Sequence, residues 1–356
     1  MRYIYFIILM FASQFVLMSQ TRVEKRIATK ASGYGATYSL PITSLIITAE
    51  VVKETYKAGP YYRYAEKYLG VKDAITEDGA SYSLGEITLE NKGVPDANSS
   101  YTVEFKAGTV APYIYVTEDG LLCAINTDYS FPSPTPVNKP KTSSQDAARI
   151  DASAHFTEEF LMAGSVARQA EVAAKQIYRI RESKMDILTG DAENLPPDGE
   201  AMKIVIKQLE DQEKALTSLF TGTRSTETSY YDVTLVPHEN LDEEVLFRFS
   251  RKLGILDADD LGGEPVIINL KATETAPTLT PKEAEKKEKQ KGIVYNVPGK
   301  ASVEILYGRN SLFKGEVQVV QFGTYELLAP VMFEDKKKPV KVIFYPETGA
   351  LKQIIQ

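Results

Sequence analysis

Prolines at positions 132, 134, 136 and 140 divide this chain of 356 residues into two parts of different character. Proline lacks a backbone N–H and has a fixed φ angle, so it is disfavoured in central strands and in helix interiors. We therefore predict that residues 130–144 form an extended, exposed linker. Strand patterns precede this linker, whereas helical patterns follow it and then give way to strands again.

Strand patterns fill the part of the chain before the linker, where β-branched and aromatic residues are frequent. The predicted strands are residues 45–56, 82–90, 101–106, 113–117 and 121–127. The last two are joined by Thr117–Gly120, whose Asp-Gly pair between apolar segments is typical of a β-hairpin. We assign residues 21–129 to an N-terminal β domain, because strands follow strands here without intervening helices.

Two long amphipathic helices are predicted after the linker. Apolar residues recur at helical spacing from Val166 onward, and Gly190 marks the end of this first helix. The second helix has Asp198 as a candidate N-cap, an apolar stripe from Met202 onward, and Gly222 as its stop. The two stripes are Val166, Ala170, Ala173, Ile177 and Ile180 in the first helix, and Met202, Val205, Leu209, Leu216 and Leu219 in the second.

A short loop between two long helices predicts an antiparallel helical hairpin, within a helical region that we place at residues 145–222. Two arrangements of this hairpin fit the sequence. Its stripes can bury each other and one face of a neighbouring β domain. Alternatively, the hairpin projects from the protein and presents one side to a partner, as helices that bind in grooves do.

Strand patterns return after the helices and predict a C-terminal β domain at residues 223–356. The predicted strands are residues 229–236, 245–249, 266–270, 293–297, 302–307, 316–321 and 340–344. Between them lies a charged loop, residues 272–292, whose lysine-rich part 281–291 is expected to be a solvated loop or a frayed helix. The expected fold class is α+β, with two mainly antiparallel β domains, sandwich-like or barrel-like, and the helical hairpin between them.

The first 20 residues have the organisation of an export signal. Arg2 precedes an apolar run, and Ser19 lies at its polar exit, so we predict a signal peptide at residues 1–20. The apolar part is short for a membrane-spanning helix, which takes about 20 residues. Leu17 occupies a position where cleavage sites prefer a small residue, so a retained anchor stays an alternative.

Composition excludes several classes of protein. The net charge of −7 gives no basic surface of the kind that binds nucleic acid. Cys123 is the only cysteine, so an exported chain of this kind has no internal disulfide and depends on its core. No segment after the leader is apolar enough to span a membrane, and we expect no transmembrane segment once the leader is removed.

Several motifs resemble one protein family. They are Gly59–Gly70, Val110–Pro112, Thr117–Cys123, Ile180–Gly190, Asp198–Gly199 and Val297–Ala301. Together they are similar to domain of unknown function 4831, a family of exported Bacteroidetes proteins of about this length. The resemblance covers nearly the whole chain after the leader. It implies the periplasm or outer cell envelope of a Gram-negative bacterium, and it implies no activity.

A tyrosine-rich segment is the one candidate binding surface in the sequence. Pro60 suits the first turn of a helix, which would place Tyr61, Tyr64 and Tyr68 on one face, with Tyr62 beside it. Such tyrosines can stack on sugar rings or anchor a protein partner. The alternative is a short helix that closes one end of the first β domain, with its phenols at the rim.

No recognisable catalytic or metal motif is present, so we expect no enzyme activity, no cofactor and no metal. Cys123 lies between apolar residues, which indicates a packed strand rather than a nucleophile. The chain has two histidines, and His155 with Glu159 forms a pair at helical spacing that many surface helices show. A hydrolase that uses two carboxylates stays open, because sequence does not reveal the distance between acids.

These observations favour a non-enzymatic, exported cell-envelope protein with a structural or partner-binding role. The alternative is a glycan- or peptidoglycan-binding module that uses the tyrosine-rich helix. The expected partner is an envelope protein or a cell-wall glycan, not a nucleic acid.

Overall fold

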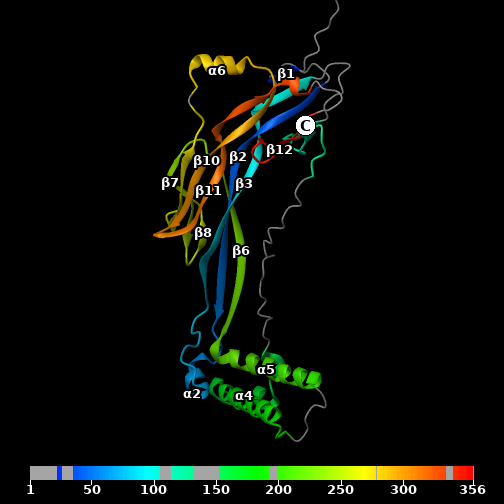
Figure 1. Cartoon of the computed structure of the whole chain (residues 1–356). Coiled ribbons are helices and arrows are strands. Elements are labelled where there is room, and N and C mark those ends of the chain that lie inside the picture. Colours follow the sequence, from blue (N-terminus) through cyan, green and yellow to red (C-terminus); the bar gives the residue numbers. More distant parts are fainter. Residues whose placement is uncertain are drawn as a thin grey trace, which may run out of the picture.

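The fold is mixed α/β, with two β-sheets and helix α6 at one end and the other helices at the opposite end (Figure 1). A computed structural model describes residues 22–25, 35–104, 114–130, 152–192, 199–277, 279–333 and 340–355. The molecule is elongated, and the strands β2, β3 and β6 connect the sheets to the helices α2, α4 and α5 (Figure 1). The predicted leader and, apart from Ser130, the predicted proline-rich linker lie outside the described residues.

The strands form two sheets, one of four strands and one of nine, and one sheet curls into a half-barrel. The first sheet has the order β1-β3-β2-β6, with β1 (Arg22–Lys25), β2 (Gly35–Lys57), β3 (Gly79–Glu104) and β6 (Thr223–Leu235). The second has the order β4-β5-β12-β13-β10-β9-β7-β8, and β11 pairs with β10. Its strands are β4 (Ile114–Val116), β5 (Leu122–Ile125), β7 (Leu241–Ser250), β8 (Gly254–Leu256), β9 (Glu264–Glu274), β10 (Ile293–Tyr307), β11 (Asn310–Leu328), β12 (Lys341–Tyr345) and β13 (Ala350–Ile355).

Most strand pairs are antiparallel, as expected, and the pairing of β10 with β13 is parallel. The sheets do not follow the domain boundaries expected from sequence, because strands from the two halves of the chain are shared. β6 belongs to the C-terminal half, yet it pairs along β2 from Leu45↔Leu235 to Lys57↔Thr223. β5 belongs to the N-terminal half, yet it pairs with β12. The long strand β2 has two edges to satisfy, and β3 covers only one of them.

Two apolar clusters hold the sheets face to face. The first packs Leu45, Ile47 and Ala49 of β2 against residues of the second sheet that include Phe247 and Ile268. The second cluster packs Tyr38, Leu40 and Val103 of the first sheet against strands β5, β10 and β12, with Ile125, Ile293 and Phe344 fully or almost fully buried. Alternation along β2 therefore buries one face against the other sheet, which is the arrangement of a two-layer β body.

Two side chains satisfy buried backbone groups across the layers. The Gln321 side chain accepts a hydrogen bond from Thr43 N at 3.0 Å and donates one to Thr43 O at 2.8 Å. The Tyr38 hydroxyl accepts from Val294 N at 2.9 Å and donates to Val294 O at 3.1 Å. Because an unpaired buried peptide group costs about 1–3 kcal/mol, these contacts fix the register of one sheet on the other.

A three-stranded arm leads from the β body to the helices. We define the arm as the paired segments Val52–Lys57, Gly79–Ser83 and Thr223–Thr228. None of these residues is buried, and Tyr82, at the end nearest the β body, packs against the first core cluster. Six residues at roughly 3.3 Å each give an arm of about 20 Å.

The arm joins the helices through short, closely packed connections. Gly59 lies against α5, because a Cβ there would clash with Leu219 O, and Tyr61 N donates to the same carbonyl at 2.8 Å. At the other joint, Gly222 adopts φ +80° and is the single residue between α5 and β6. Glycine is required at both positions, at the first for close backbone approach and at the second for the left-handed conformation.

The helical end contains two short and two long helices beside two 3-10 turns. They are η1 (Tyr62–Tyr64), α2 (Ala65–Leu69), η2 (Ala152–His155), α3 (Glu158–Leu161), α4 (Val166–Thr189) and α5 (Gly199–Thr221). The predicted limits of the first long helix are confirmed: the Ser165 side chain caps it by accepting from Arg168 N, and Gly190 ends it at φ +82°. The predicted N-cap Asp198 lies outside the described residues.

The apolar stripes of the long helices are only partly buried. Ala170, Ala173, Ile177 and Ile180 are buried, but Val166, which the spacing places on the same stripe, is 54% exposed. These residues pack against α3, α5 and the η1–α2 segment, and no strand residue belongs to this third cluster. One of the two expected arrangements had the helices covering a face of a β domain. The helices do not do so, because the arm holds them away from the β body (Figure 1).

The lysine-rich segment forms a helix, α6 (Pro281–Glu288), on the surface of the molecule. Thr280 and Glu283 form a capping box, in which the threonine side chain accepts from Glu283 N and the glutamate side chain accepts from Thr280 N. This local cap, with proline at the first turn, explains why a segment without an apolar face is helical.

Candidate functional site

The tyrosine-rich segment lies where the arm meets the helices, and its four tyrosines have different environments. Tyr61 is 5% exposed and belongs to the core of the helical end, so it does not form part of a binding surface. Tyr62, Tyr64 and Tyr68 are half-buried. The predicted face of Tyr61, Tyr64 and Tyr68 therefore turns toward the helices, and only its edge reaches solvent.

Tyr61 is the central aromatic residue of the helical end. Its ring lies 6.2 Å from that of Phe160 in an edge-on geometry and 5.6 Å from that of Phe220. Its hydroxyl donates to Gln169 Oε1 at 3.3 Å, and burial raises its pKa, so the phenol stays protonated. These contacts connect η1 to α3, α4 and α5 at once, which identifies Tyr61 as a structural residue.

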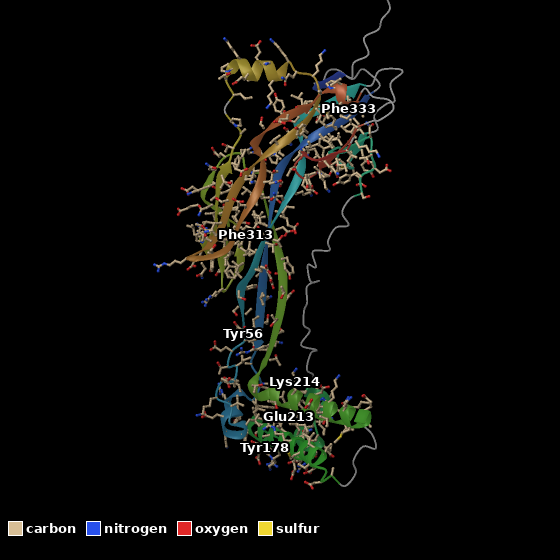
Figure 2. All side chains as sticks on the ribbon, in the orientation of Figure 1. Tyr56, Tyr178, Glu213, Lys214, Phe313 and Phe333 are labelled. Carbon is tan, nitrogen blue, oxygen red and sulfur yellow. The ribbon has the colours of Figure 1, made fainter. Side chains whose placement is uncertain are left out.

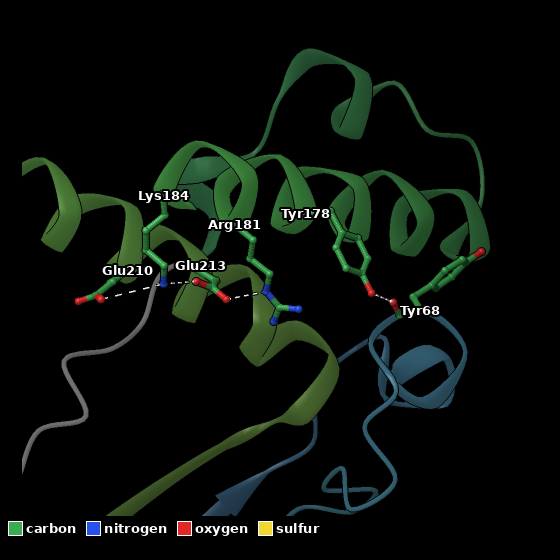
Figure 3. A network of polar contacts seen from close by, with 6 residues as sticks. All are labelled: Tyr68, Tyr178, Arg181, Lys184, Glu210 and Glu213. Atoms are coloured by element: carbon green, nitrogen blue, oxygen red, sulfur yellow. Dashed lines mark hydrogen bonds and ion pairs between the residues drawn. The ribbon is translucent and has the colours of Figure 1, made fainter. Parts of the chain in front are cut away.

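The other tyrosines form the rim of the same cluster. Tyr64 and Tyr68 lie 6.1 Å apart, and Arg63 Nε donates to the Tyr62 hydroxyl at 3.1 Å. The Tyr178 hydroxyl of α4 donates to the Tyr68 backbone carbonyl at 2.7 Å and so fastens α2 to α4 (Figure 3). The candidate surface from sequence is thus reduced to the half-buried rims of Tyr62, Tyr64 and Tyr68.

An ion-pair network joins α4 to α5 (Figure 3). The Glu213 carboxylate accepts from Arg181 Nε at 2.7 Å and from Lys184 Nζ at 2.9 Å, while Lys184 Nζ lies 4.0 Å from Glu210. Desolvation of Glu213 acts to raise the pKa of its carboxyl, but the hydrogen bonds and charges of Lys184 and Arg181 outweigh it and lower the pKa. Glu213 is therefore ionised at neutral pH and holds two cations of the neighbouring helix.

The distal half of the two long helices leaves apolar side chains uncovered. We define the distal apolar patch as Met185 and Leu188 of α4 with Ile204 and Val205 of α5, whose exposed fractions are 60%, 60%, 61% and 37%. No residue of α4 after Ile180 and no residue of α5 before Ala215 is buried among the described residues. Sequence spacing found these helices but did not show that half of each would lack a covering surface.

The remaining candidate residues have structural environments. Cys123 is fully buried in β5, and burial raises the pKa of its thiol to about 11, so the reactive thiolate is not formed at neutral pH. The backbone carbonyl of His155 accepts from Gln176 Nε2 at 2.8 Å, and Glu159 pairs with Arg168 at 3.2 Å. No group of three or more potential metal ligands occurs within the described ranges.

Residues 34–352 match the model of a protein family described as a domain of unknown function (DUF4831). The chain belongs to this family. Comparison with curated proteins and comparison with solved structures each return no match. The DUF4831 region contains the arm, the helical end and both sheets except for β1 and the end of β13. No helix in the described part of this DUF4831 chain is long and apolar enough to cross a membrane.

The Glu213 network of the DUF4831 helices has a predictable pH dependence. Because its folded-state pKa is lowered, Glu213 contributes stability above its ordinary value of 4.5, and this contribution disappears as pH falls through the folded-state pKa. We expect Glu213→Gln to destabilise the protein by about 1 kcal/mol at pH 7, because partly exposed ion pairs are screened. The difference from wild type should become smaller as pH falls from 7 to 3.

Urea unfolding at pH 7 and pH 3 measures this effect. Glu210→Gln is the matched control, since Glu210 is more exposed and lies 4.0 Å from Lys184, and it should change stability little at either pH. An equal effect of Glu213→Gln at both pH values contradicts the electrostatic account and indicates lost packing.

Proposed function

We propose that this chain is a non-enzymatic, exported cell-envelope protein that binds another envelope protein through the distal apolar patch. The main support for this proposal is that α4 and α5, which are neighbours, expose apolar side chains, namely Met185, Leu188, Ile204 and Val205. Exposed apolar groups that cluster on one surface are typical of protein interfaces. Met185 and Leu188 follow Lys184, which lies 4.0 Å from Glu210 of α5, so the α4 and α5 residues of the patch lie toward the same end of the two helices.

The geometry of the helices supports this function. Arg181 pairs with Glu213, and Lys184 pairs with the earlier residue Glu210, which is the order of an antiparallel hairpin. The arm places this hairpin away from the β body (Figure 2), where Tyr56 marks the arm and Tyr178 the helical end. An ordered hairpin on a three-stranded arm loses little conformational freedom when it binds, so more of the contact energy is available for affinity.

The export part of the proposal rests on the leader. Arg2, the apolar run after it and the polar exit at Ser19 have the order of a signal peptide. The DUF4831 resemblance noted from the motifs points to the envelope of a Gram-negative bacterium. We expect the mature protein to start at Gln20 or Thr21 and to fractionate with the periplasm or outer envelope, which N-terminal sequencing of the fractionated protein measures.

A photo-crosslinking amino acid at position 204 tests the binding function in cells. We expect it to capture one recurrent envelope protein, which mass spectrometry identifies. The purified partner should then bind the wild-type chain at least tenfold more tightly than a Leu188→Asp variant, because a charge would be buried in an apolar interface.

Leu261 provides the matched control, since it is 84% exposed but lies on the β body. A crosslinker at position 261 should not capture the same protein, and Leu261→Asp should bind it like wild type. Equal capture from both positions, or unchanged affinity of Leu188→Asp, contradicts binding through the distal apolar patch.

A further inference from the structure

A pocket of about 440 Å³ lies where α5 continues into β6. Its wall includes the last two turns of α5, Gly222, the first residues of β6, and Arg181 from α4. Figure 3 shows β6 leaving the end of α5 beneath the Arg181 side chain. The pocket is thus built from three elements that the joint between arm and helices holds together.

The cationic side chains in this pocket have hydrogen-bond donors that the described residues leave unused. Arg181 uses its Nε for Glu213 at 2.7 Å, and its two terminal nitrogens make no hydrogen bond with the described residues. Lys214 is exposed and pairs with no acid in the described part of the chain. It lies next to Glu213 at the helical end (Figure 2). Arg224 lies at the start of β6, with NH1 3.5 Å from Glu54. A guanidinium edge beside an ammonium group suits a carboxylate.

Hydroxyl groups line the helix side of the pocket. Ser218 donates its hydrogen to Ala215 O at 2.7 Å, and Thr221 donates its hydrogen to Thr217 O at 3.2 Å. Since each hydroxyl hydrogen is already used, the oxygens offer acceptor lone pairs toward the pocket. The Thr217 hydroxyl oxygen is buried and has no partner among the described residues. The wall therefore suits a ligand with hydrogen-bond donors, such as hydroxyl groups, next to an anionic group that the cationic side chains bind.

The acids at the pocket limit the charge of the ligand. Glu210 and Glu213 line the same pocket as Arg181, Lys214 and Arg224, which leaves an excess of one cation in the lining. A dianionic phosphate would meet repulsion from these two carboxylates, whereas a single carboxylate matches the one unpaired ammonium group.

We propose that this pocket binds a small sugar acid, that is, a ligand with one carboxylate and several hydroxyl groups. The carboxylate contacts the terminal nitrogens of Arg181 and the ammonium group of Lys214. The ligand hydroxyls donate to the oxygens of Ser218 and Thr221. The volume is within the range of small-molecule sites and accommodates a single sugar ring.

Calorimetric titration of the full chain with glucuronic acid tests this assignment. We expect saturable binding of glucuronic acid, and at least tenfold weaker binding of glucose and of inorganic phosphate. Lys214→Met should weaken glucuronic acid about tenfold, as loss of one charge-assisted hydrogen bond predicts. Lys214 is exposed, so this variant should keep the fold.

Lys207→Met is the matched control, because Lys207 is an exposed lysine of α5 outside the pocket. It should bind glucuronic acid within twofold of wild type. The proposal is overturned by an absence of glucuronic acid binding, by equal binding of glucose, by tighter binding of phosphate, or by equal effects of the two lysine variants.

Discussion

Replacing Tyr61 by alanine is expected to lower the free energy of unfolding of the helical end by about 3–5 kcal/mol. The side chain is 5% exposed and packs between Phe160 and Phe220, so its removal leaves a cavity that the rigid joint cannot close. Its backbone N–H is held by Leu219 O at 2.8 Å, which prevents the segment from collapsing into the space. This is the largest effect that we expect from a single side chain of the helical end.

Two further variants separate packing from other roles of this tyrosine. Tyr61→Phe loses only the 3.3 Å hydrogen bond to Gln169 and should cost about 1 kcal/mol or less. Tyr64→Ala removes a half-buried ring at the rim and should cost clearly less than Tyr61→Ala. Hydrogen exchange of α4 and α5 measures the local stability, because the arm separates these helices from the β body. Equal protection in Tyr61→Ala and Tyr64→Ala contradicts the assignment of Tyr61 as the central core residue.

Replacing Tyr38 by phenylalanine is expected to cost about 2–4 kcal/mol, although only one oxygen atom is lost. That oxygen accepts from Val294 N at 2.9 Å and donates to Val294 O at 3.1 Å, inside the second core cluster. Phenylalanine fills the same space and leaves both peptide groups of Val294 without a partner. Burial raises the pKa of Tyr38, so the hydroxyl is protonated and able to donate at neutral pH.

Tyr101→Phe is the control for this prediction. Its ring stacks on Tyr38 at 5.6 Å, but its hydroxyl makes no hydrogen bond with the described residues. The change should therefore alter stability by less than about 0.5 kcal/mol. Urea unfolding of the β body, followed by circular dichroism, measures both variants. A Tyr38→Phe protein as stable as Tyr101→Phe contradicts the role of this hydroxyl in joining the sheets.

Features set by neighbouring residues were predictable from the sequence. The first long helix begins after the Ser165 cap and ends at Gly190, because a side chain three residues away and a left-handed glycine determine these limits. The hairpin across Thr117–Gly120 is confirmed by the antiparallel pairing of β4 with β5. The composition of the charged segment after Thr280 fits both a loop and a frayed helix, and the capping box of Thr280 and Glu283 stabilises the helix.

Features that depend on distant residues could not be read in this way. The strand β6 has no buried residue, so its alternation carries no signal for pairing with β2, which lies about 180 residues earlier. Tyr61 and Tyr64 look alike in sequence, and only the approach of Phe160 and Phe220 buries one of them. The pocket beside Gly222 is lined partly by Arg181 of another helix, so no local sequence motif predicts it.

The sequence by itself determined the family, the long helices, most strand positions and the absence of recognised catalytic motifs. Local hydrogen bonds, backbone preferences and side-chain periodicity are properties of short segments, so they can be predicted from consecutive residues. The tertiary structure decided which strands share a sheet, which tyrosine is core, and which apolar residues stay uncovered. These outcomes depend on which segments pack together after the chain has folded back on itself. Burial of apolar surface stabilises such contacts between distant segments, and no local sequence pattern predicts them.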